Sequence, residues 1–219
     1  MLDLWVALAG PAGAGKSCLS RAAGAALGQA GVPIDVCGED ELFTRPEFGR
    51  AARQFRGPAA PGPEDLEACY AAWVSGLPRQ SVAVTDWDPA GMAGDLPWAT
   101  RDQLRLRRHL QVVRALAAQA IVINLQVPVE VAVNRAAVER GEEWLVRSDQ
   151  VARAAGHHQQ DRLARVHAWT QAHTIRIAAE LRVAASAGWL IAEVDASGSP
   201  QATLSRALEA LAHTGGREA

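Results

Sequence analysis

The chain has 219 residues, of which 49% are apolar and 21% charged, and its formal net charge is −2. This length suits one domain with a substantial core. The slight acidity argues against a general nucleic-acid binder, which usually carries a basic excess. No run of about 18 apolar residues indicates a membrane span. Asp3 in the apolar start argues against a targeting peptide.

The composition also bears on the compartment and on partners. The three cysteines show no C-x-x-C spacing, which is typical of buried thiols in a reducing cytoplasm. We therefore expect a cytoplasmic protein that binds neither nucleic acid nor a membrane. A homodimer stays open.

Short apolar runs alternate with longer helical patterns along the chain. Strands are predicted at 4–9, 33–36, 81–86, 120–125 and 189–194. Helices are predicted at 16–27, 47–56, 128–140, 158–185 and 200–211. Three further helices are predicted to begin near 64, at 100 and after 148, and 87–99 is predicted to be a loop. Thr100 and Gln103 suggest a capping box, with Leu106, Leu110, Val113 and Ala117 as that helix's apolar stripe. This alternation predicts an α/β/α sandwich around a mostly parallel five-stranded sheet, with ligands at the carboxyl ends of the strands.

A phosphate-binding pattern joins the first strand to the first helix. The stretch Gly10-Pro11-Ala12-Gly13-Ala14-Gly15-Lys16-Ser17 fits G-x-x-x-x-G-K-[ST] at every fixed position. The glycines let backbone N–H groups face phosphate oxygens, and the helix N-terminus adds partial positive charge. Lys16 would reach the β- and γ-phosphates, and the Ser17 hydroxyl would ligate Mg²⁺. We expect ATP at Gly10, Ala12, Gly13, Ala14, Gly15, Lys16, Ser17 and Cys18.

Lys16 is the only lysine in the chain. The ammonium therefore stands where a triphosphate needs it. The guanine-reading motif Asn-Lys-x-Asp of GTPases requires a second lysine, so the sequence excludes it. A transporter- or helicase-type ATPase is disfavoured because the chain is short and lacks both a Leu-Ser-Gly-Gly-Gln signature and a basic excess.

Two acidic clusters directly follow predicted strands. In Glu39-Asp40-Glu41, Asp40 is the first choice for the carboxylate that orients an acceptor hydroxyl and takes its proton. In Asp86-Trp87-Asp88, Asp86 is the candidate Mg²⁺ ligand, usually through water, and both aspartates are candidate substrate contacts. The alternatives are a solvated acidic turn, a helix cap, or a turn before Pro89.

Arginines supply the candidate positive charges. Arg135 and Arg140 follow the fourth strand, with Arg147 beyond them, and either of the first two is a candidate to stabilise the transferring phosphoryl group. Their alternative is a helix surface. Arg53 is a candidate contact for an anionic substrate such as a nucleotide monophosphate, although a solvated helix face is favoured for its group of arginines. His157, His158, His167 and His173 fit no zinc spacing and are expected on helix surfaces.

Taken together, these motifs resemble the P-loop small-molecule and nucleotide kinases. That group includes the adenylate- and thymidylate-kinase-like enzymes, shikimate and gluconate kinases and chloramphenicol phosphotransferase-like proteins. The resemblance implies a catalytic carboxylate at Asp40 within Gly38-Glu39-Asp40, and an arginine-bearing lid that covers ATP, similar to Val131–Gly141 with Arg147 beyond. It also implies an adenine-bordering turn at Val194–Gly198. Thymidylate-type kinases carry Asp-Arg after the third strand, and deoxynucleoside kinases carry Glu-Arg-Ser there, whereas this chain has Asp86-Trp87-Asp88. The resemblance therefore does not identify the acceptor.

The expectation is therefore a single P-loop kinase domain over 1–219, a P-loop NTPase sandwich. An acceptor-binding helical segment is expected at 44–79, and a lid at about 135–157. ATP with Mg²⁺ would serve as phosphoryl donor to a hydroxyl of a metabolite, nucleoside, nucleotide or antibiotic. The alternative is an ATP-binding regulatory or resistance protein, or an ATPase, without transfer to an acceptor.

Overall fold

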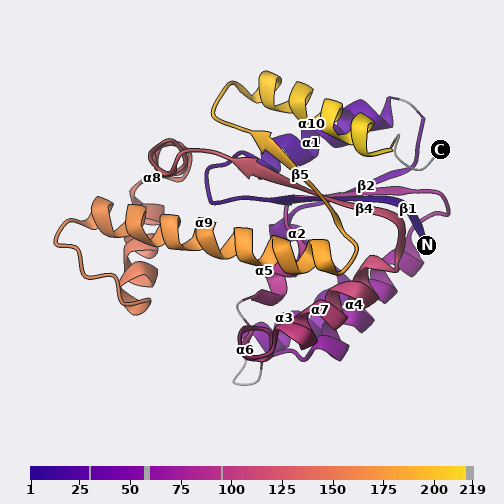
Figure 1. The fold of residues 1–219 in the computed structure, drawn as a ribbon, viewed down its shortest axis with the longest axis horizontal. Coiled ribbons are helices and arrows are strands. Elements are labelled where there is room, and N and C mark those ends of the chain that lie inside the picture. The colour runs from indigo at the N-terminus through magenta and orange to yellow at the C-terminus, as the bar shows by residue number, and fades with distance from the viewer. Residues whose placement is uncertain (30, 57–59, 95, 216–219) are drawn as a thin grey trace.

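A computed structural model describes residues 1–29, 31–56, 60–94 and 96–215. Its sheet is a single layer of parallel strands in the order β2-β3-β1-β4-β5 (Figure 1). The strands are β1 (Leu2–Ala9), β2 (Ile34–Cys37), β3 (Val82–Thr85), β4 (Ala117–Gln126) and β5 (Leu190–Asp195). The predicted α/β/α sandwich around a five-stranded parallel sheet is confirmed.

Helices cover both faces of the sheet (Figure 1). One face is covered by α1 (Lys16–Gly28) and α10 (Pro200–Gly215), and the other by α4 (Pro63–Gly76), α5 (Pro89–Gly94), α7 (Gln103–Arg114) and α9 (Arg162–Ser186). The remaining helices are α2 (Glu39–Leu42), a 3₁₀ turn at Pro46–Phe48, α3 (Gly49–Arg56), α6 (Pro97–Arg101) and α8 (Val129–Ala154).

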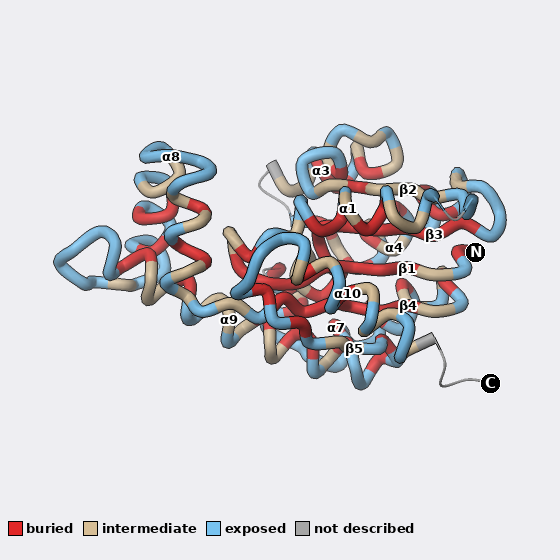
Figure 2. The backbone as a smooth tube through the Cα atoms, turned by 90° about the horizontal axis from the view of Figure 1, so that it is seen from above, coloured by how far each residue is buried: buried red, intermediate tan, exposed pale blue. Residues whose placement is uncertain are grey.

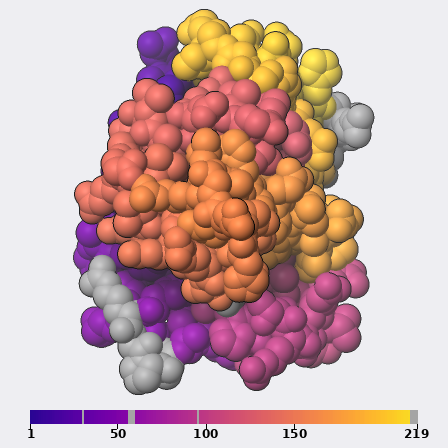
Figure 3. Space-filling model, turned by 90° about the vertical axis from the view of Figure 1, so that its left-hand side faces the viewer, coloured from indigo at the N-terminus to yellow at the C-terminus, as the bar shows by residue number. Residues whose placement is uncertain are grey.

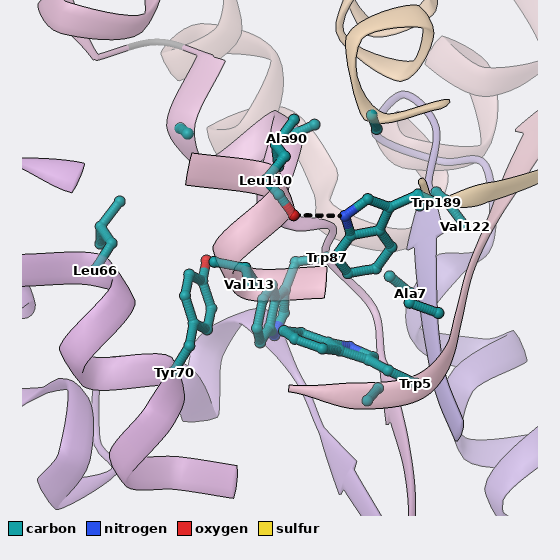
Figure 4. Close-up of a cluster of buried hydrophobic side chains, with 14 of the residues drawn as sticks. Trp5, Ala7, Leu66, Tyr70, Trp87, Ala90, Leu110, Val113, Val122 and Trp189 are labelled. Atoms are coloured by element: carbon teal, nitrogen blue, oxygen red, sulfur yellow. Dashed lines mark hydrogen bonds between the residues drawn. The ribbon is translucent and has the colours of Figure 1, made fainter. Parts of the chain in front are cut away.

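An aromatic cluster fills the second face (Figure 4). Trp5 of β1 is fully buried, and its ring centroid lies 5.9 Å from that of Trp87 and 5.4 Å from that of Trp189. The Trp5 indole N–H donates to Thr85 Oγ1 at 3.2 Å, and the Trp189 indole N–H donates to the Leu110 carbonyl at 3.0 Å. Burying large aromatic rings in this way is strongly stabilising. The cluster therefore anchors the end of β3, which carries the acidic residues on either side of Trp87.

Four local predictions need correction. The segment 87–99 is not a loop, because Pro89 begins α5 and Pro97 begins α6, positions where proline costs a helix no hydrogen bond. Thr100 does not cap the next helix: Asp102 does, and its Oδ1 accepts from the Arg105 N–H at 3.0 Å. Ala117 begins β4 instead of extending the helical stripe.

The fourth correction concerns α8, which breaks at Gly141 as predicted. The left-handed φ of 72° at Gly141 suits a residue without Cβ. Helix resumes directly after this break, well before Ser148. Residues 57–59, which follow the helix predicted at 47–56, and residues 216–219 lie outside the described residues.

The second half of α8 and the start of α9 form a helical hairpin that projects beyond the carboxyl ends of the strands (Figure 2). The Arg165 guanidinium donates two hydrogen bonds to the Asp149 carboxylate, of 2.5 and 3.2 Å, and both side chains are nearly buried. This bidentate pair fixes the two helices to each other.

Every helix in the described part of the chain is too short or too polar to cross a membrane.

Candidate active site

The loop between β1 and α1 has the backbone geometry of a phosphate cradle. Gly10, Gly13 and Gly15 have φ values of 141°, 79° and 92°, which favour glycine. The Lys16 ammonium donates to the Gly10 carbonyl at 2.7 Å, so it lies folded over its own loop. A Cβ added at Gly13 would lie 2.9 Å from the Ala132 carbonyl carbon and closer still to its oxygen, so the loop packs directly against α8.

The sheet register brings both acidic clusters to this loop. Thr85 of β3 lies opposite Ala7 of β1 and Cys37 of β2, so the residues after these three positions meet at one edge. There the Asp86 carboxylate accepts a hydrogen bond from the Glu39 backbone N–H at 2.5 Å. Asp86 and Asp88 are buried, with exposed fractions of 6% and 7%. Two clusters that lie 47 residues apart in sequence therefore form a single acidic site.

Burial and neighbouring charges shift the pKa values of Lys16 and Asp88. Burial lowers the pKa of Lys16, and the charge of Arg140 lowers it further, whereas the charges of Glu39, Asp86 and Asp88 raise it. Burial raises the pKa of the Asp88 carboxyl, against backbone N–H groups and Lys16, which lower it. Asp88 also accepts from the Gly91 N–H at 2.8 Å. Asp88 is therefore a carboxylate of increased basicity beside a buried ammonium.

Several cavities adjoin the loop, and two of them lie on opposite sides of its chemistry. A cavity of about 460 Å³ lies along the start of α1 and the turn between β5 and α10, and its lining includes Gly13, Cys18, Arg135, Ala196 and Gly198. A smaller cavity of about 180 Å³ is here called the α9 cavity. Its polar lining residues are Lys16, Glu39, Asp86, Asp88, His173 and Arg176. The loop thus lies between a largely apolar cavity and one whose lining carries five charged side chains, those of Lys16, Glu39, Asp86, Asp88 and Arg176.

The predicted lid arginines have different surroundings. Arg135 donates to the carbonyls of Ala196, Ser197 and Gly198 at 2.7, 2.8 and 2.9 Å, so it holds the β5–α10 turn at the larger cavity. Arg140 lines a small recess with Lys16 and Ser17. Exposed Arg147 lies 4.0 Å from Glu143. Of the three, Arg140 is the arginine that shares a recess with Lys16.

Asp40 and Arg53 lie farther out. Asp40 is exposed on α2 and lines an outer cavity of about 630 Å³ together with Ser17, Asp86 and Arg140. Arg53 is exposed on α3. Among the described residues that line the α9 cavity, none comes from 44–79. The roles predicted for Asp40, Arg53 and this segment stay predictions.

Helix α9 contributes side chains that sequence reasoning missed. His173, Arg176 and Ile177 line the α9 cavity (Figure 3 shows α8 and α9 across this end of the molecule). The expectation of a surface histidine is therefore wrong for His173, which is half-buried. A signal was available, because polar side chains at 173, 176 and 180 share one helical face with the buried Ile177 and Leu181.

The oxygen donors of this site fit Mg²⁺. Ser17 and Asp86 line the same recess as Lys16, and hard oxygen ligands are what Mg²⁺ prefers. Within the described ranges, no group of three or more His, Cys, Asp or Glu is arranged to hold a metal.

No protein-family model matches the chain, and a search of curated proteins finds no match. Two solved structures are similar over most of its length. A gluconokinase from Sinorhizobium meliloti 1021 has 18% identity and a TM-score of 0.44, over 97% of this chain and 93% of that one. A deoxyadenosine kinase from M. mycoides with bound dATP has 16% identity and a TM-score of 0.48, over 95% and 98%.

Proposed function

We propose that the protein is an ATP-dependent kinase that transfers the γ-phosphoryl group to a hydroxyl of a small molecule. One observation supports this most: Lys16 belongs to the phosphate loop and also lines the α9 cavity, beside Glu39, Asp86 and Asp88. A protein that only bound a nucleotide would have no need of three carboxylates around a second cavity. A phosphotransferase needs donor phosphate and acceptor hydroxyl to meet at such a place.

The donor side is assigned from the loop and its neighbours. The N–H groups of Gly10–Ser17 would bind the phosphates, and the larger cavity bordered by Arg135 would take the nucleobase. On binding, Lys16 would leave the Gly10 carbonyl and contact the β- and γ-phosphates, with Arg140 beside it. Ser17 and Asp86 would hold Mg²⁺, which neutralises phosphate charge when bound.

The acceptor side is assigned to Asp88. The acceptor oxygen attacks the γ-phosphorus, the bond from that phosphorus to the bridging oxygen breaks, and ADP leaves. The hydroxyl proton passes to a carboxylate. Asp88 suits this step because it is buried in the α9 cavity and burial raises its pKa, which strengthens it as a base. Asp40, which the sequence favours, is the second candidate.

The test is ADP production with and without acceptors, using wild-type protein and three variants. We expect ATP turnover to rise at least tenfold with a productive acceptor. Lys16→Ala is expected to remove it, Asp88→Asn to lower it by about 10²–10⁴-fold, and Asp40→Asn to change it less than threefold. ATP turnover indifferent to every acceptor would instead support the ATPase alternative. A large loss in Asp40→Asn alone would move the base to Asp40.

A further inference from the structure

Two side chains of the α9 cavity have no part in the chemistry assigned so far. They are His173 and Arg176, which stand one helical turn apart on α9 and face the same space as Asp88. A guanidinium can only donate, so the contact of 2.8 Å from Arg176 Nη2 to His173 Nδ1 makes Nδ1 the acceptor. Burial lowers the pKa of His173, and the charge of Lys16 lowers it further. The ring is therefore neutral and carries its proton on Nε2.

Glu180 holds Arg176 in this position. Its Oε1 lies 3.4 Å from Arg176 Nε, and its side chain is only 8% exposed. Gly94 of α5 backs the carboxylate so tightly that an added Cβ would lie 3.1 Å from Oε2 and closer still to Oε1. The carboxyl group therefore has little room to turn, and it holds the guanidinium in place.

The charges around the cavity restrict what it can hold. Its lining carries three carboxylates, those of Glu39, Asp86 and Asp88, against two cationic side chains, those of Lys16 and Arg176. An anionic group in this half-enclosed space would face an excess of carboxylates, which is costly at low local dielectric. A cationic group would meet Lys16 and Arg176. A neutral polar group avoids both penalties.

We propose that the α9 cavity is the acceptor subsite and that it selects a small, neutral, hydroxyl-rich acceptor such as a sugar or polyol, held between Asp88 and Arg176. Asp88 accepts the hydrogen bond of the hydroxyl that reacts. Arg176 donates to the oxygen of a neighbouring hydroxyl, and the Nε2–H of His173 is a further donor. The pairing needs two adjacent hydroxyls and no net charge on the acceptor.

The size of the cavity agrees with this class. Its volume of about 180 Å³ is below the range of roughly 300–1,000 Å³ that is usual for drug-sized ligands. Glu180 acts through Arg176 and is a positioning residue for this subsite.

The inference rests on the proposed function, and its test separates the two. Nucleotide binding is measured first, by titration of a fluorescent ATP analogue. ATP-dependent phosphorylation is then measured for D-glucose, D-gluconate and D-glucosamine, which share six carbons and differ in charge, and for ribitol, D-ribose, glycerol and AMP. We expect a neutral member to be used, with kcat/KM at least tenfold above those of gluconate, glucosamine and AMP. Absent nucleotide binding would refute the proposed function itself. Intact nucleotide binding with a charged acceptor preferred overturns the inference alone, whereas intact nucleotide binding with no acceptor used overturns the inference and the proposed function together.

Variants of α9 test the assigned residues. Arg176→Met is expected to raise the acceptor KM at least tenfold, and Glu180→Gln about threefold to tenfold, while the affinity for the ATP analogue stays within twofold. Arg182, exposed on the same helix, is the matched control, and Arg182→Gln is expected to leave both constants unchanged. A fall in kcat with unchanged acceptor KM in Arg176→Met would remove Arg176 from acceptor binding. If Arg176→Met does not fold, Arg176→Lys, which keeps the charge but not the fork, is expected to show the KM effect.

Discussion

Two glycines of the phosphate loop form a matched pair for a stability experiment. Gly13 and Gly15 both have left-handed φ values, of 79° and 92°, so alanine at either position costs about 1–2 kcal/mol of backbone strain. They differ in surroundings. Nothing lies within 4 Å of a Cβ added at Gly15, whereas one added at Gly13 would meet the backbone of Ala132 in α8 and lie 3.1 Å from the Ala136 nitrogen.

The difference between the two variants follows from this contact. A backbone cannot move aside as a side-chain end can, so the loop and α8 must separate, at a cost of about 1–3 kcal/mol. We therefore expect Gly13→Ala to lower the free energy of unfolding by about 1–3 kcal/mol more than Gly15→Ala. For a chain of this length, that is a difference of roughly 2–10 °C in Tm.

The measurement is urea or thermal unfolding without nucleotide, because both glycines belong to the candidate phosphate site and bound nucleotide would add its own stabilisation. Gly15→Ala is the control for backbone strain. Equal losses in the two variants, within about 0.5 kcal/mol, would show that the loop does not pack against α8 as the structure has it.

Two further predictions concern Glu180 and Arg135. Burial raises the pKa of Glu180 from its ordinary 4.5 to about 7, so between these values the folded state keeps a proton that the unfolded state releases. The free energy of unfolding should fall as pH rises across this window, by on the order of 2 kcal/mol after allowance for solvent screening. Glu180→Gln should flatten this pH dependence in urea melts. Equal slopes in wild type and variant would contradict the prediction. Arg135→Ala removes the donor to the carbonyls of Ala196–Gly198 and should weaken binding of a fluorescent ATP analogue about tenfold. Arg147→Ala is the control and should not weaken this binding. Equal effects of the two substitutions would remove Arg135 from the nucleobase cavity.

The fold could be predicted from local patterns because its strands are short apolar runs bounded by glycine, proline or acidic residues. The phosphate loop is a contiguous motif, so its position between β1 and α1 follows from spacing alone. Local patterns failed where two residues could each cap the N-terminus of the same helix. Asp102 displaced Thr100 as the cap of α7, since a carboxylate two residues later offers the N-terminus an equally good acceptor.

The acceptor side could not be predicted in the same way. Asp86 and Asp88 were found because each follows a strand closely, and strand ends share one edge of a parallel sheet. His173 and Arg176 lie in the middle of a 25-residue helix, and only the packing of α9 against α5 brings them to Asp88. The spacing of polar residues on the buried face of α9 marks them as unusual but does not say what they face.

The two halves of the candidate site are mechanically connected through the α8–α9 hairpin. α8 carries Arg135 and Arg140 on the nucleotide side, and α9 carries His173 and Arg176 on the acceptor side. The buried contact between Asp149 and Arg165 fixes the two helices to each other. The break at Gly141 separates Arg135 and Arg140 from this contact, so the contact restrains the acceptor-side helix directly and the donor-side arginines only through the break.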